Sequence, residues 1–281
     1  MKKTISLFLF VLAALSIQAQ VETPQASPHG KIWQKVGLTD VTVEYSRPSM
    51  RGREIFGDLV PFDKKWRTGA NENTTISFSD DVKIDGETLP KGTYAIYTVP
   101  HENNWEVMFY KKTDNWGLPQ QWDNAEVALS TKVNVSDMPF NMETFTIVID
   151  ELTNDSAMLN FLWADVVTSL KFEVPTEAKA MESIEATLDG PSARDYYSAA
   201  DYYYMSDKDL NQALQWMNKA IESEDSPAFW MLRKKSLIEA KLGKKKDAIK
   251  TAQASLKAAK AAGNDDYVKM NEDSLKEWGA M

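Results

Sequence analysis

The spacing of apolar residues changes close to Pro175, and this change constrains the fold of the 281-residue chain more than any other feature. Before it, apolar and polar side chains alternate with a period of two, as at residues 41–45 and 93–99. Beyond it, apolar residues recur at every third or fourth position, which is typical of helices. The sequence therefore predicts an α+β two-domain chain in which a β domain precedes an all-α domain.

The first half contains many short alternating segments separated by residues that favour turns, such as Asp85-Gly86 and Asn154-Asp155. The expected strands include residues 41–45, 75–78, 93–99, 105–110, 145–149, 157–163 and 166–174. No helical pattern lies between them, so a parallel sheet with helical crossovers is not expected. The pattern predicts an antiparallel β-sandwich-like domain over residues 24–174.

The second half, residues 176–281, predicts helices only. Thr176 is a candidate cap for a first helix at residues 179–188, which Asp189-Gly190-Pro191 closes. Asp225-Ser226-Pro227 and Leu242-Gly243-Lys244 supply later breaks. The remaining helices are expected at residues 192–204, 207–222, 226–241, 244–261 and 264–277.

The helical half contains a weak repeat. Ala213-Leu214 and Ala248-Ile249 lie 35 residues apart, each near the start of a second helix, and Leu242-Gly243 precedes the second pair. These residues resemble the turn and small-residue positions of tetratricopeptide repeats. The resemblance covers residues 193–262, with 264–277 as a capping helix, and implies contact with a protein partner. Asp207-Lys208 departs from the pattern, and generic helical hairpins are the alternative.

The first residues have the pattern of a secretory signal peptide. Lys2 and Lys3 give a positive start, and residues 5–17 form an uncharged, mostly apolar run. The run is shorter than the roughly 20 residues of a membrane-spanning helix. We expect a signal peptide at residues 1–19, export to the periplasm or the outside, and no transmembrane segment after signal removal. A buried N-terminal strand is the alternative.

Composition excludes several classes of function. The chain has no cysteine, which excludes disulfides, cysteine nucleophiles and thiolate metal sites. Its formal net charge of −9 argues against nucleic-acid binding, which depends on neutralising phosphates. The only histidines are His29 and His101, and their spacing resembles no zinc site. We expect no metal and no cofactor, and no motif marks a catalytic residue.

Polar and aromatic residues gather in one stretch of the first half. Arg47 and Arg67 carry guanidinium groups that bind carboxylates or phosphates, and Trp66 offers a face for a sugar or a cation. The residues expected to bind a small anionic or glycan ligand are His29, Tyr45, Arg47, Trp66, Arg67, Asn71 and Glu72. The structural alternative is that Arg67 pairs with Glu72 or Glu44 while the aromatic rings fill the core.

Motifs of the same stretch resemble an exported bacterial family known as domain of unknown function 2911. They are Ser-Pro-His at 27–29, Tyr-x-Arg-Pro at 45–48, Gly-Arg-x-Ile-Phe-Gly-Asp-Leu-Val-Pro at 52–61, Trp-Arg-Thr-Gly-Ala-Asn-Glu at 66–72 and Leu-Pro-x-Gly-Thr-Tyr-Ala at 89–95. The resemblance covers residues 24–174, and Trp122-Asp123 departs from the expected Tyr-Asp. It implies an exported β domain and no particular activity.

Two other groups are candidates for binding. One is a carbohydrate-stacking surface formed by Trp105, Trp116 and Trp122. The alternative is that these tryptophans are anchors of the core and of loops. In the helical half, a basic patch that includes Lys234, Lys241 and Lys245 is a candidate docking surface for an acidic partner or for the acidic β domain of the same chain. An ordinary solvated helix face is the alternative for that patch.

These patterns favour a non-enzymatic binding or interaction protein. Its helical repeats would contact a protein, and its arginine-rich β surface would take a small anionic or glycan ligand. The competing class is a periplasmic hydrolase, acting on carbohydrate beside Arg47 and Arg67. A third alternative is a purely structural β module.

Overall fold

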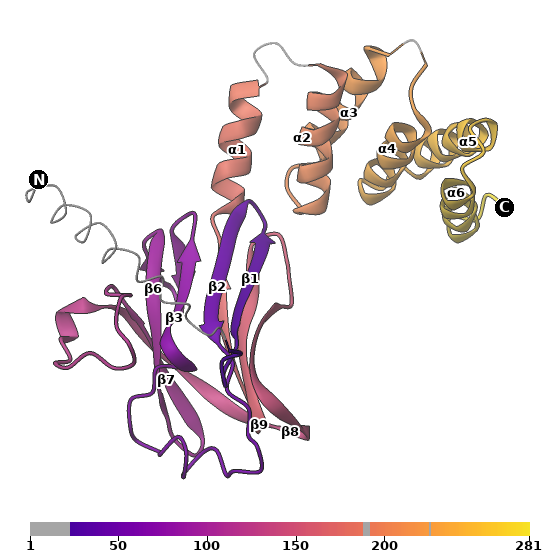
Figure 1. Cartoon of the computed structure of the whole chain (residues 1–281). Coiled ribbons are helices and arrows are strands. Elements are labelled where there is room, and N and C mark those ends of the chain that lie inside the picture. Colours follow the sequence, from indigo (N-terminus) through magenta and orange to yellow (C-terminus); the bar gives the residue numbers. More distant parts are fainter. Residues whose placement is uncertain (1–22, 188–191, 225) are drawn as a thin grey trace, which may run out of the picture. The chain divides into compact units, whose positions relative to one another are not determined.

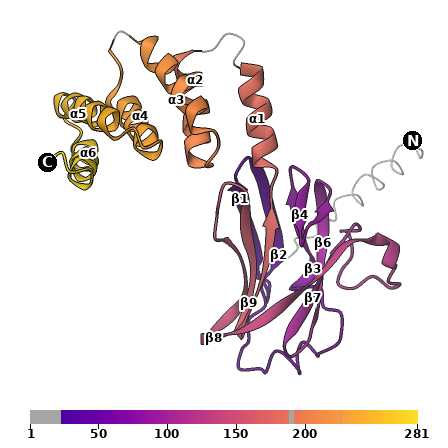
Figure 2. The ribbon, with the colours of Figure 1, turned by 180° about the vertical axis from the view of Figure 1, so that it is seen from behind.

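A computed structural model describes residues 23–187, 192–224 and 226–281. The chain divides into two compact units between Thr176 and Glu177, called here the β unit and the helical unit (Figures 1 and 2). The expected signal peptide at residues 1–19 and the expected breaks at 189–191 and Asp225 lie outside the described residues. No helix within the described ranges has both the length and the apolar character needed to cross a membrane.

The β unit is one antiparallel sheet. Together with the helices that follow it, this sheet confirms the predicted α+β fold class. Its strands are β1 (His29–Val36), β2 (Thr39–Ser46), β3 (Ala70–Phe78), β4 (Val82–Ile84), β5 (Glu87–Leu89), β6 (Gly92–Pro100), β7 (Asn104–Tyr110), β8 (Val127–Asp150) and β9 (Ser156–Glu173). Their order in the sheet is β1-β2-β3-β6-β7-β8-β9-β4-β5. A 3-10 turn, η2 (Asn124–Glu126), precedes β8.

The long strand β8 folds this sheet over itself. Its first residues pair with β7, and from Val135 onward it pairs with β9, with register shifts around Met142. The two parts of the sheet therefore face each other across one core (Figures 1 and 2). Ring contacts cross this core, such as that of Phe78 with Phe172 at 5.6 Å between centroids. The arrangement is sandwich-like because the alternating apolar residues of both parts point inward.

Strands β1, β4 and β5 were not among the expected segments, β3 begins before the expected residue 75, and the largest differences in extent are those of β8 and β9. Strand β8 starts at Val127, far before the expected segment at 145–149. Strand β9 is continuous where two strands were expected: its pairing with β8 runs on both sides of Ala164, which has a positive φ of 53°. Such a local irregularity keeps the ladder while it re-aims the strand.

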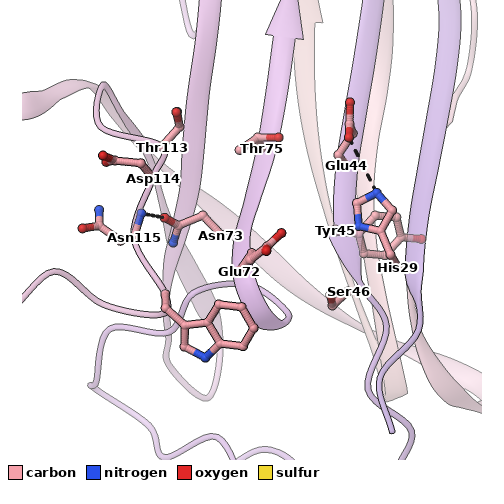
Figure 3. Close-up of a pocket in the computed structure, with 11 residues that line it drawn as sticks. His29, Glu44, Tyr45, Ser46, Glu72, Asn73, Thr75, Thr113, Asp114 and Asn115 are labelled. Atoms are coloured by element: carbon pink, nitrogen blue, oxygen red, sulfur yellow. Dashed lines mark hydrogen bonds and ion pairs between the residues drawn. The ribbon is translucent and has the colours of Figure 1, made fainter. Parts of the chain in front are cut away.

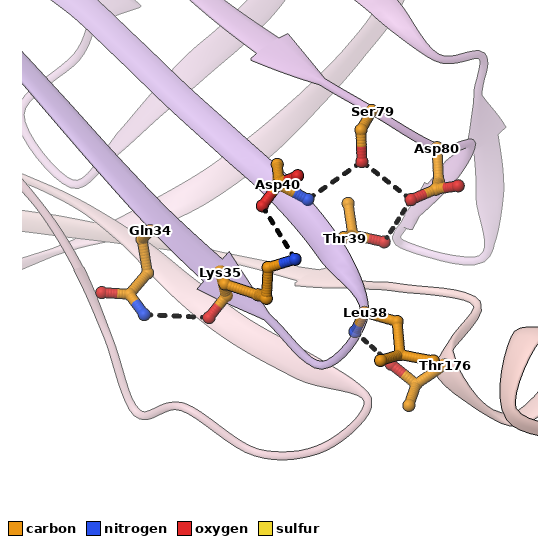
Figure 4. A network of polar contacts seen from close by, with 8 residues as sticks. All are labelled: Gln34, Lys35, Leu38, Thr39, Asp40, Ser79, Asp80 and Thr176. Atoms are coloured by element: carbon orange, nitrogen blue, oxygen red, sulfur yellow. Dashed lines mark hydrogen bonds and ion pairs between the residues drawn. The ribbon is translucent and has the colours of Figure 1, made fainter.

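The turn between β1 and β2 is packed against the end of the β unit. Gly37 has a φ of +54°, and a Cβ on it would collide with Thr176 Oγ1 and with the carbonyl oxygen of Asn154. The backbone N–H of Leu38 donates to Thr176 Oγ1 at 3.4 Å (Figure 4). Glycine is therefore required in this turn both for its dihedral angle and for its lack of a side chain.

The helical unit consists of consecutive helices (Figure 1). They are α1 (Thr176–Thr187), α2 (Ala193–Met205), α3 (Leu210–Glu222), α4 (Phe229–Lys241), α5 (Lys245–Ala261) and α6 (Asp265–Glu277). Ala213 of α3 and Ala248 of α5 are both completely buried. Small buried residues at these two positions fit the resemblance to tetratricopeptide repeats, because they let neighbouring helices approach closely.

Candidate functional site

A polar pocket of about 360 Å³ opens on the outer side of β1, β2 and β3 (Figure 3). Glu72 and Asn73 of β3 lie in the middle, with His29 and Glu44 on one side and Asp114 on the other. The complete lining is His29, Glu44, Tyr45, Ser46, Glu72, Asn73, Thr75, Thr113, Asp114, Asn115 and Trp116. The pocket is within the size range of sites for small ligands.

Strand pairing places the sheet side of this pocket. Glu44 of β2 is paired with Thr75 of β3, and Lys31 of β1 is paired with Glu44 on the other side. Side chains alternate between the two faces of a sheet, so these three residues point outward while Val43 and Ile76 enter the core. The register between β2 and β3 shifts beyond Glu44, which makes room for Ser46 at the pocket.

Asn73 holds the loop that forms the opposite wall. Its side chain is 6% exposed, and its Nδ2 donates to the hydroxyl of Tyr97 and to the carbonyl of Gly117, both at 2.9 Å. Its Oδ1 accepts the backbone N–H of Asn115 at 3.0 Å. The Tyr97 hydroxyl donates to the same Gly117 carbonyl at 3.1 Å, and burial raises the pKa of Tyr97. The residues of the loop are thus positioned by a buried polar network.

Carboxylates dominate the charge of the pocket. Lys31 Nζ lies 2.8 Å from Glu44 Oε1, and His29 Nε2 lies 3.6 Å from Glu44 Oε2. The hydrogen bond from Lys31 lowers the pKa of Glu44, and the charges of Lys31 and His29 act in the same direction. Glu72 and Asp114 are exposed carboxylates of the same lining. The pocket therefore offers acceptors to a ligand and repels an anion.

One large aromatic side chain of the lining is open to solvent. Trp116 is 67% exposed. The other two tryptophans of the expected stacking surface have structural positions, since Trp105 is 1% exposed and Trp122 packs on Tyr110 with 4.6 Å between ring centroids. Trp116 alone of the three can present its indole face to a ligand.

Three of the seven expected site residues line the pocket: His29, Tyr45 and Glu72. Tyr45 contributes little polar surface, because it is 3% exposed and its hydroxyl accepts the N–H of Ile147 at 3.0 Å. The structure brings these three together with Glu44, which the sequence interpretation considered only as a partner for Arg67.

The two arginines of the expected site bind the chain itself. Arg47 donates from Nε to the carbonyl of Phe145 at 3.2 Å and from Nη2 to Thr146 Oγ1 at 2.8 Å. Arg67 donates from Nη1 to the carbonyl of Asn71 at 3.1 Å. Arg47 thus joins the end of β2 to β8, whereas Arg67 bonds within its own turn, so the structure does not gather Arg47 and Arg67 around one cavity.

The remaining two residues also have structural contacts. Trp66 stacks on Trp163 with 5.8 Å between ring centroids, and its indole N–H donates to the carbonyl of Gly69 at 3.1 Å. Asn71 Nδ2 donates to the carbonyl of Ser27 at 3.1 Å. Neither residue belongs to the pocket lining.

Two of the three lysines expected to bind a partner form ion pairs within the helical unit. Lys234 lies 2.6 Å from Asp201 Oδ1 and 4.8 Å from the centroid of the Tyr204 ring. Lys241 pairs with Asp207 and lies over the same Tyr204 ring, 5.1 Å from its centroid. Lys245 is exposed at the first position of α5.

Within the described ranges, no group of three or more histidine and carboxylate side chains is placed to hold a metal ion.

Sequence reasoning missed Asn73, Asp114 and Asn115 as pocket residues. The only signal in the sequence is the polar, turn-rich character of residues 111–126, which does not indicate what this loop packs against.

The fold and the pocket define a class of protein: a folded-over antiparallel sheet with a polar surface pocket, followed by an array of short helices. The family model described as "Protein of unknown function (DUF2911)" matches residues 27–172, and the chain belongs to this family. This confirms the family predicted from the motifs at residues 27–95. No curated protein and no solved structure matches the chain.

Proposed function

We propose that the chain is an exported binding protein whose β unit takes a small, neutral, hydroxyl-rich ligand of the glycan type. The observation that carries this proposal is the exposed indole of Trp116 at a pocket lined by the carboxylates of Glu44, Glu72 and Asp114. Carboxylates accept hydrogen bonds from sugar hydroxyls, and an indole face packs against the apolar face of a sugar ring. Export rests on the signal-like residues 1–19.

The charge of the pocket favours one of the two ligand types expected from the sequence. An anionic ligand would need cationic side chains that are free to bind it, and Arg47 and Arg67 are engaged with the chain. The carboxylates of the lining would repel an anion. The glycan alternative is therefore supported and the anionic alternative is not.

The experiment is a titration of the full chain with neutral oligosaccharides, followed by calorimetry. Trp116→Ala should weaken binding about tenfold or more, because it removes the stacking surface. Trp33→Ala is the matched control, since Trp33 is also exposed, at 60%, and lies outside the lining. Equal affinities of the wild type and Trp116→Ala would contradict the site, and failure of every neutral sugar to bind would favour the purely structural module.

Hydrolysis of a glycosidic bond is the second candidate function, because carboxylates lie on opposite sides of the pocket (Figure 3). The lowered pKa of Glu44 suits a base or nucleophile. Chromogenic glycosides test this candidate. Cleavage that is abolished in Glu44→Gln would support hydrolysis. A sugar that binds but is never cleaved would contradict hydrolysis and leave binding as the function of the pocket.

For the helical unit we propose contact with a protein partner. The support is its array of consecutive helices and its resemblance to tetratricopeptide repeats. Of the three lysines expected to mediate this contact, Lys245 is the candidate that forms no ion pair among the described residues. A pull-down with the wild type and with Lys245→Gln tests its role. Equal recovery of the partner would remove Lys245 from the contact.

A further inference from the structure

A groove of about 440 Å³ lies among α3, α4 and α5 of the helical unit. It is separate from the face that carries Lys234 and Lys241, neither of which lines it. The polar residues of its lining that matter here are Asn218, Lys235, Glu239, Lys244, Asp247 and Lys250. The groove therefore combines carboxylates with an excess of ammonium groups.

Glu239 is a buried carboxylate with too few partners. Its side chain is only 6% exposed, and its Oε2 is buried without accepting a hydrogen bond from any described residue. Lys235 Nζ approaches the other oxygen, Oε1, at 3.7 Å, which is too long for a good hydrogen bond. A buried charge in this condition is costly, and a donor supplied by a ligand would lower that cost.

Lys244 and Lys250 supply positive charge to the same groove. Both are exposed, and across the described parts of the chain neither has a carboxylate within 4.0 Å. Their ammonium groups are thus available to an anionic group. A ligand that fits the groove must carry a hydrogen-bond donor for Glu239 and negative charge for these two lysines.

We propose that the groove binds a short acidic segment of a partner protein. A backbone N–H of that segment donates to Glu239 Oε2, and its acidic side chains lie beside Lys244 and Lys250. A peptide carries N–H groups and carboxylates within a few atoms of each other, whereas a simple anion or a nucleic-acid backbone offers no donor and is repelled by Glu239. The inference rests on the proposed partner contact of the helical unit and is independent of the pocket in the β unit.

The probe is a blocked hexapeptide of alternating glycine and glutamate, titrated into the full chain by calorimetry. Lys244→Gln together with Lys250→Gln should weaken binding about tenfold or more. Lys246→Gln with Lys257→Gln is the matched control, because both lysines belong to α5 and lie outside the lining. The same hexapeptide with glutamine in place of glutamate should bind at least about tenfold more weakly than the acidic one.

Glu239→Gln separates a binding role from a structural one. It should weaken the acidic peptide about tenfold or more, yet leave the melting temperature of the free protein unchanged or higher, because a poorly paired buried charge is removed. Unaltered peptide affinity in this variant and in the double lysine variant would overturn the groove while leaving partner contact elsewhere on the helical unit. Lack of any binding of the acidic peptide at millimolar concentration would overturn the acidic segment as ligand, whatever the pull-down with Lys245→Gln shows.

Discussion

The side-chain amide of Asn73 donates to the carbonyl oxygen of Gly117 at 2.9 Å, although 44 residues separate them in the sequence. This bond joins the central strand of the pocket to its loop wall. Both groups are buried, so water cannot replace the bond if one partner is lost. The shape of the pocket therefore depends on a residue that contributes little surface to it.

Asn73→Ala should destabilise the protein by about 2–4 kcal/mol, because three hydrogen bonds are lost and the Gly117 carbonyl loses its amide donor. Urea unfolding measures this change. Asn134→Ala, at an exposed asparagine of β8, should stay within about 0.5 kcal/mol of the wild type. Similar losses in the two variants would contradict the role of Asn73.

Gly117→Ala should disturb the same wall for a different reason. Gly117 has a φ of +89°, and a Cβ on it would lie 2.9 Å from Arg67 Nη1. Gly52→Ala is the matched control, since its φ is +72° and no atom lies within 4 Å of the added Cβ. The dihedral penalty of about 1–2 kcal/mol is shared, so the excess loss in Gly117→Ala measures the contact with Arg67. Adding Arg67→Ala should recover that excess, and failure to do so would contradict the contact.

Gly37→Ala should be among the most damaging single substitutions of the β unit. The added Cβ would collide with Thr176 Oγ1 and with a main-chain oxygen of Asn154, which cannot move aside as a flexible side chain can. We expect a loss of about 3 kcal/mol or more, or insoluble protein. Gly86→Ala, also at positive φ but in open space, should fold and lose only the dihedral penalty. Equal thermal stability of the two variants would count against the packed turn.

Alkaline pH should destabilise the helical unit through Tyr197. Burial raises the pKa of its hydroxyl to about 12, above the ordinary value of 10.0. A raised pKa contributes stability that is complete below the unfolded value and is lost as pH rises, here between about pH 10 and about pH 12. Tyr197→Phe should lose less stability over this range in urea unfolding, while Tyr196→Phe should behave as the wild type does. Parallel pH curves for all three proteins would refute the assignment.

The pair of Lys31 and Glu44 predicts the opposite pH dependence. The hydrogen bond from Lys31 lowers the pKa of Glu44 below its ordinary value of 4.5. The resulting stability is present above that value and is lost as pH falls through the lowered pKa. Lys31→Gln should move the pKa of Glu44 upward in an NMR titration, and its stability difference from the wild type should vanish in acid. An unchanged titration of Glu44 would show that Lys31 does not control it.

The sequence predicted the fold class because alternation and helical spacing are local signals. The helices at 192–204 and 264–277, for example, lie within one residue of α2 and α6. The length of strand β8 was underestimated because residues 130–144 are mostly exposed or half-buried on both faces, which removes the alternating pattern. The continuity of β9 through Ala164, a residue other than glycine with a positive φ, is not indicated by the residue type at that position.

The candidate site was predictable only in part. His29, Tyr45 and Glu72 belong to motifs of one stretch, and strand pairing does bring them to one pocket. The role of Arg47 depended on the carbonyl oxygen of Phe145, which only the tertiary structure brings within reach, whereas that of Arg67 depended on a local turn to Asn71. The loop from Thr113 to Trp116 reaches the pocket through the buried amide of Asn73, a contact that no spacing in the sequence indicates.

The close packing of Gly37 against Thr176 has a consequence for folding during synthesis of the chain. The first hairpin of the β unit leaves the ribosome early, but the residue that receives its turn is synthesised 139 positions later. The hairpin therefore cannot reach its final packing until the last strand has emerged. Such distant pairing slows folding and leaves apolar strands uncovered for longer. We expect the nascent chain to need protection by chaperones until Thr176 is available.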